Sequence, residues 1–145
     1  MIELLKSSRV ILYYNGAISA LTLFLQHPDE SVCAPSPLPA LSSVLEDDEM
    51  PLNIAHTPPA LVVNAISKAM NLPDQLLQAN TDYREQVDTP DGIITVYLAH
   101  FNVLDPPHQL MAGKGGKFRT LTELRTRPPA EMELLRRAYT LVMES

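Results

Sequence analysis

Two short segments of this 145-residue chain hold side chains that could bind an ion. Glu46-Asp-Asp-Glu49 is a run of carboxylates, and carboxylate oxygens are the ligands that hard divalent cations prefer. Gly113-Lys-Gly-Gly-Lys117 combines glycines with two cations, a composition that can cradle a phosphate. It lacks the Gly-x4-Gly-Lys-Ser/Thr spacing of a P-loop. The alternative interpretations are a solvated acidic loop for the first segment and a mobile hairpin-like loop for the second.

The histidines and the cysteine form no known catalytic or metal-binding motif. His27, His56, His100 and His108 lack the His-x3-His or similar spacing of metal ligands. The single cysteine, Cys33, excludes an internal disulfide and a multi-cysteine zinc site. Cys33 and His56 could act as nucleophile and base, but nothing in the sequence brings them together. A lone cysteine in a proline-rich loop is normally inert.

Composition limits the classes of partner. The net charge of −6 argues against nonspecific binding to nucleic acid or to an anionic membrane, although a small basic pocket is compatible with it. With 46% hydrophobic residues, the chain can bury one core, so we expect a single domain over residues 1–145. No segment reaches the roughly 18 apolar residues that span a bilayer. We therefore expect a cytoplasmic protein, a compartment that a single free thiol also suits.

The first half of the chain predicts a hairpin and a long irregular segment. Arg9 to Gln26 favours a hairpin, because Asn15-Gly16 readily forms a type I′ turn. Ala17 to Leu25 could instead form a helix of about two turns. His27 to Pro59 holds seven of the 13 prolines and is expected to be mostly irregular. Within it, Pro39 to Leu45 could form a short turn of helix.

The middle of the chain predicts a helix followed by a hairpin. Thr57-Pro58-Pro59 is typical of a helix start, with Thr57 as the cap, and Asn71 can take the left-handed conformation that ends one. Leu76 to Val87 and Ile93 to Phe101 are expected to be strands, the second central and covered on both faces. The apolar face of the helix is expected to contain Leu61, Val62, Ala65, Ile66, Ala69 and Met70.

The end of the chain predicts a short strand and a last helix. Phe118 to Leu121 is expected to be the strand, and Pro128-Pro129 opens the helix. Glu131 and Glu133 lie in its first turn, where the helix dipole favours anions. Arg136 and Arg137 are expected to face solvent. The buried face is expected to contain Met132, Leu135, Ala138, Tyr139 and Val142.

The order of elements from Thr57 to Phe101 resembles the middle of a Nudix hydrolase domain. The Nudix motif is Gly-x5-Glu-x7-Arg-Glu-U-x-Glu-Glu-x-Gly-U, where U is a bulky aliphatic residue. With Leu72 as the last U, Ile66 falls on the other U and Asn71 on the glycine. The resemblance covers about Ser8 to Glu144 as an order of elements, with Thr122-Glu-Leu124 in a strand before the last helix. It implies an α+β fold, a Nudix-like mixed β-sheet flanked by helices.

The metal-binding positions of that motif are not kept. In Nudix enzymes these carboxylates hold the Mg²⁺ that neutralises a diphosphate. A lysine in place of a glutamate reverses the local charge. The resemblance therefore implies the fold without metal-dependent hydrolysis and without a cofactor. The motif positions from the opening glycine to the glutamate pair are occupied by Met50, His56, Asn64, Ala65, Lys68 and Ala69.

We therefore expect a non-hydrolytic module that binds a nucleotide-like small molecule or a protein partner. One alternative is a divergent hydrolase of nucleoside diphosphate derivatives, with Mg²⁺ ligands at Glu46 to Glu49 or at Glu123. Another is a homodimer formed through an exposed edge of the first hairpin. The candidate ligand-binding residues are Asn64, Lys68, Arg84, Lys114 and Lys117.

Overall fold

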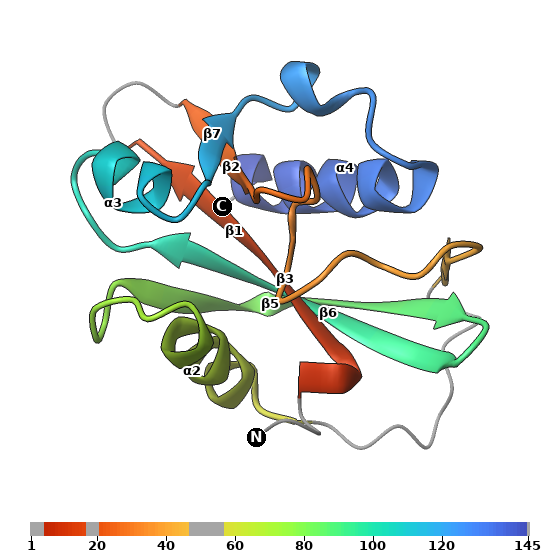
Figure 1. Cartoon of the computed structure of the whole chain (residues 1–145). Helices are drawn as coiled ribbons and strands as arrows, with labels where there is room; N and C mark the ends of the chain where they lie inside the picture. The colour runs from red at the N-terminus through yellow and green to blue at the C-terminus, as the bar shows by residue number, and fades with distance from the viewer. Residues whose placement is uncertain (1–4, 17–20, 47–56, 145) are drawn as a thin grey trace.

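The computed structural model describes residues 5–16, 21–46 and 57–144, and Figure 1 shows its arrangement. A mixed sheet forms the middle layer, with helices on both of its faces. The helices are α2 (Pro59–Ala69), α3 (His108–Ala112), the 3-10 helix η2 (Thr122–Leu124) and α4 (Pro129–Glu144). The α+β class expected from the sequence is confirmed.

The sheet is built around one parallel pair of strands. Its strands are β1 (Ser8–Asn15), β2 (Thr22–Gln26), β3 (Cys33–Ala34), β4 (Ser43–Val44), β5 (Leu77–Thr89), β6 (Gly92–Phe101) and β7 (Lys117–Arg119). Their order is β4-β5-β6-β1-β2-β7, and β3 pairs with β1 alongside β2. Strands β1 and β6 are parallel, and the other pairs are antiparallel. The sheet therefore has β6 and β1 at its centre.

Side-chain alternation along β1 divides the core into two layers. Val10 and Leu12 pack on the face that carries α2, whereas Ile11 and Tyr13 pack on the face that carries α4. Strand β6 alternates in the same way and is buried on both faces, as its continuous apolar sequence predicts. The two cores hold α2 and α4 on opposite sides of the sheet (Figure 1).

Helix α2 begins and ends where the sequence predicts, but its cap and its buried face differ. Pro58, not Thr57, is the N-cap residue, and no side chain caps the helix. Asn71 takes the predicted left-handed conformation with φ of 55° and ends the helix. The buried face is rotated toward Val63, which leaves Leu61 55% exposed. Ala69 is also exposed, because the helix contacts the sheet through its middle turns.

The first hairpin is confirmed, but its turn is longer than predicted. The β1–β2 pairing ends at Asn15 opposite Thr22, and the Gly16 amide donates to the Leu21 carbonyl at 3.0 Å. Asn15-Gly16 is therefore not a two-residue turn, and residues 17–20 lie outside the described residues. The alternative helix is wrong over Thr22 to Leu25, because these residues belong to strand β2. The edge expected to be free is covered, since β7 pairs with β2.

Three short elements differ from the sequence predictions. Ser43–Val44 is strand β4, paired with β5, in the segment where a turn of helix was expected. Thr122–Leu124 is a 3-10 helix rather than a strand. Helix α3 was not predicted, because its five residues are too few to show a helical period. Of the acidic run, only Glu46 lies within the described residues.

The N-terminal turn of α4 carries a buried carboxylate. Glu131 is only 2% exposed and accepts hydrogen bonds from the Ser31 hydroxyl at 3.0 Å and the Val32 amide at 3.2 Å. Arg127 completes the site with two charge-assisted bonds of 3.0 and 2.9 Å. Leu134 is buried and Tyr139 is 37% exposed, so the buried face is rotated away from the expected position of Tyr139.

We predict that Glu131→Gln destabilises the protein by about 3 kcal/mol, because a buried ion pair that loses one partner leaves the other charge uncompensated. Urea unfolding followed by circular dichroism would measure this loss. The exposed Asp74 supplies a matched control: Asp74→Asn should change stability by no more than about 0.5 kcal/mol. Equal effects of the two substitutions would contradict a structural role for the Glu131 charge.

Candidate functional site

A cavity of about 400 Å³ opens at the C-terminal end of α2. Three connections bring their residues together there: the segment after β2, the segment after β3 and the turn after α3. The volume is within the range of small-molecule sites. The cavity is lined by His27, Pro28, Asp29, Ala34, Pro35, Ala69, Met70 and Lys114.

Lys114 reaches this cavity because the Gly-rich segment is a packed turn, not an open hairpin-like loop. The amides of Lys114 and Gly116 donate to the Met111 carbonyl at 3.0 and 2.8 Å. Gly115 has φ of +82°, and a Cβ at this position would lie 2.5 Å from Cγ of Pro28. Only glycine allows so close an approach in this conformation. The turn therefore packs against Pro28 and places Lys114, half-buried, in the cavity wall.

His27 contributes an imidazole in which one ring nitrogen lacks a hydrogen-bond partner among the described residues. Its Nε2 is buried and has no hydrogen-bond partner within the described part of the chain. Burial lowers the pKa of His27 below its ordinary value, and the nearby carboxylates of Asp29 and Glu131 oppose that shift. The ring is therefore neutral near pH 7. A buried polar atom without a partner costs about 1–3 kcal/mol.

The remaining walls of the cavity are largely apolar. Pro28, Pro35 and Met70 offer surfaces against which a flat ring can pack. The Asp29 carboxylate is already an acceptor for the Ser31 amide at 3.0 Å. No ion pair of Lys114 is present among the described residues. The cavity thus combines apolar walls with one cation and one neutral imidazole.

The other predicted ligand-binding residues do not line this cavity. Asn64 and Lys68 are exposed on α2, and Lys117 is exposed on β7. Arg84 donates through Nη2 to the Thr57 carbonyl at 2.9 Å, near the start of α2. Its guanidinium lies 5.8 Å from the centre of the Tyr97 ring, a cation–π contact. Since α2 is about 16 Å long, Arg84 and Lys114 lie at opposite ends of it.

A larger cavity, of about 620 Å³, lies beside α4, and a network of ion pairs forms part of its wall. Arg137 donates to Glu85 at 2.6 Å, to Glu133 at 2.8 Å and to Glu46 at 2.9 Å. Although burial lowers the pKa of Arg137, the hydrogen bonds with Glu133 and Glu85 raise it overall. The prediction that Arg137 faces solvent is therefore wrong, and its charge joins α4 to β5 and to the segment after β4.

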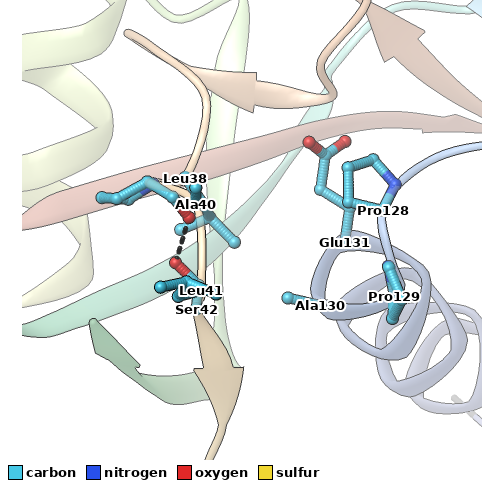
Figure 2. Close-up of a pocket in the computed structure, with 9 residues that line it drawn as sticks. Leu38, Ala40, Leu41, Ser42, Pro128, Pro129, Ala130 and Glu131 are labelled. Carbon is cyan, nitrogen blue, oxygen red and sulfur yellow. Dashed lines mark hydrogen bonds between the residues drawn. The ribbon is translucent and has the colours of Figure 1, made fainter. Parts of the chain in front are cut away.

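A third cavity, of about 290 Å³, lies between residues 38–42 and the start of α4. Figure 2 shows these two segments facing each other, with the Ser42 hydroxyl bonded to the Pro39 carbonyl at 2.5 Å. The Glu131 carboxylate is already used by Ser31, Val32 and Arg127. The rest of the lining is mainly proline, leucine and alanine, so this cavity offers little chemistry.

Cys33 and His100 pack against other parts of the fold. Cys33 is buried, and burial raises the pKa of its thiol to about 12, so it is the inert cysteine that the sequence predicts. His56 lies outside the described residues. His100 is half-buried and packs against Tyr13 with ring centres 5.8 Å apart. Among residues 5–16, 21–46 and 57–144, no three His, Cys, Asp or Glu side chains are grouped so as to hold a metal ion.

The sequence matches no protein-family model and no curated protein. No helix in the described part of the chain is long and apolar enough to cross a bilayer. The cavity at the end of α2 is therefore assigned from its geometry and chemistry alone.

We predict that His27 makes stability depend on pH. Because its pKa is lowered from 6.5 in the folded state, the unfolded chain binds the proton more readily. The stabilising effect is present above pH 6.5 and is lost as the pH falls below that value. His27→Gln should therefore lose less stability than the wild type between pH 7 and pH 5.5, as measured by urea unfolding at each pH.

An NMR titration of the imidazole signals supplies an independent readout of the same property. A His27 midpoint at or above 6.5 in the folded protein would contradict the prediction, whatever the unfolding data show.

Proposed function

We propose that the protein binds a small nucleotide-like anion in the cavity at the end of α2 and does not hydrolyse it. The observation that carries the proposal is the meeting of Lys114, His27 and the last turn of α2 in one cavity. The lysine can neutralise an anionic group, and the neutral imidazole lines the same cavity without adding a competing charge. Pro28, Pro35 and Met70 can pack against its ring.

The proposal includes a Nudix-like fold. A mixed sheet between helices, with α2, the β5–β6 hairpin and α4 in that order, agrees with such a domain. The metal-binding glutamate pair of the Nudix motif corresponds to Lys68-Ala69 in this chain, and Ala69 lines the cavity. Lys114, from the turn after α3, would then place a positive charge near the end of α2, where a Nudix enzyme holds Mg²⁺.

The divergent hydrolase is the weaker hypothesis, because its described carboxylates have other partners. Glu46 binds Arg137. Glu123 accepts hydrogen bonds from Thr120, which lower its pKa, and forms an exposed ion pair with Arg119. Both carboxylates are therefore engaged in contacts within the protein.

We predict that a nucleotide or sugar nucleotide raises the melting temperature without added Mg²⁺. A ligand at a hundred times its dissociation constant adds about 2.7 kcal/mol to stability, which corresponds to a rise of several degrees in a domain of this size. Thermal unfolding in the presence of nucleotides, dinucleotides and sugar nucleotides, with EDTA or with Mg²⁺, measures it. A shift that requires Mg²⁺ and is accompanied by product release would sink the proposal.

Two substitutions locate the binding. Lys114→Ala should raise the dissociation constant about tenfold by removing the cation. Ala69→Leu should block the cavity at little cost to folding, because Ala69 is exposed and leucine is a good helix former. Ala112→Leu is the matched control, since Ala112 is exposed at the end of α3 and does not line the cavity. Binding that survives both Lys114→Ala and Ala69→Leu would place the ligand elsewhere.

A further inference from the structure

Arg9, the second residue of β1, is a buried cation at the start of the central strand. Only 7% of the residue is exposed. Its Nη1 donates to the Ser8 carbonyl at 2.9 Å and, at longer range, to the carbonyls of Leu5 and Lys6. Its Nε and Nη2 both donate to the Pro37 carbonyl, at 3.4 and 3.3 Å. Every acceptor of this guanidinium within the described residues is a neutral carbonyl.

The positive charge of Arg9 is therefore without a carboxylate partner in the described part of the chain. The buried carboxylate of Glu131 is held by Arg127 in a bidentate pair. A guanidinium has five N–H groups, and the single bond from Nη2 leaves one of its two protons without an acceptor among the described residues. Moving an ion out of water costs several kcal/mol unless an opposite charge offsets it.

This charge lies in the wall of a separate cavity of about 370 Å³, lined by Leu5, Lys6, Arg9, Pro35 and Ser36. Lys6 is exposed and adds a second cation. Ser36 adds a hydroxyl, which can donate to an oxyanion. Pro35 separates this cavity from the one at the end of α2, because it lines both.

We propose that Arg9, Lys6 and Ser36 form a site for a small oxyanion, a phosphate or carboxylate group. Arg9 supplies a fixed guanidinium held by backbone carbonyls, and Lys6 supplies a mobile charge at the rim. A fixed guanidinium matches the geometry of phosphate and carboxylate oxygens. This site is independent of ligand binding at Lys114.

A purely structural role for Arg9 explains less of the geometry. Joining the Pro37 carbonyl to the start of β1 needs hydrogen-bond donors, which a neutral amide side chain also has. It needs neither a full charge nor a second cation across a cavity. An oxyanion in the cavity would account for both.

The test is a titration with inorganic phosphate and, separately, with acetate, at constant ionic strength in chloride. The readout is the Arg9 Nε–H signal and the Ser36 amide signal in ¹H–¹⁵N NMR spectra. Saturable shifts of both signals are expected. Lys6→Glu should weaken that binding about tenfold, since it replaces an attraction at the rim with a repulsion. Tighter binding of phosphate or of acetate would distinguish the two oxyanion groups.

Two variants with the same charge change serve as controls. Arg125→Glu alters an exposed cation that lines none of the cavities described above, and Lys114→Glu alters the other proposed site. Both should leave the Arg9 titration unchanged. Absence of saturable shifts in the wild type, or equal weakening by Lys6→Glu and Arg125→Glu, would overturn the site. Loss of the Arg9 response in Lys114→Glu alone would assign the anion to the cavity at the end of α2 and overturn it as well.

Discussion

The buried carboxylate of Glu131 joins parts of the chain that are about a hundred residues apart, and much of the structure depends on it. Its bonds to Ser31 and Val32 fasten the segment before β3 to the first turn of α4. The Ser31 hydroxyl oxygen in turn accepts a hydrogen bond of 3.0 Å from the Cys33 amide, at the start of β3. Since β3 pairs with β1, this chain of contacts fixes an irregular segment against the central strand. The cavity walls at His27 to Asp29 and at Ala34-Pro35 lie on either side of it.

The parts of the fold that could be predicted are those with a clear local signal. The continuous apolar run of β6, the left-handed Asn71 after α2 and the Pro-Pro start of α4 each specify their element without distant contacts. Ser43–Val44 has no such signal, because it becomes a strand only by pairing with β5. The burial of Glu131 has no signal in the sequence for a related reason. A glutamate in a first helical turn is usually solvated, and only the distant Ser31 and Val32 bury this one.

The candidate site was only partly accessible from the sequence. The glycines around Lys114 mark it in the sequence, and that signal reflects a real constraint, the close approach of Gly115 to Pro28. No sequence spacing marks His27 as a site residue. It lines the cavity only because three separate connections meet there. Arg84 and Lys114 could not be separated by sequence, because the path of the chain between them determines which end of α2 each one reaches.

The short strands at the two ends of the sheet bear on how copies of this chain meet. The order of strands leaves β4, with two residues, at one end and β7, with three, at the other. At the first of these ends, β4 pairs only with Val87 and Asp88, so most of β5 has no neighbouring strand on that side among the described residues. Strand β7 offers few backbone groups to an approaching strand, and it carries the cations Lys117 and Arg119. Two copies that met through β7 would bring like charges together. The β7 edge therefore opposes growth of the sheet from one molecule to the next, and with it the onset of fibrillar aggregation.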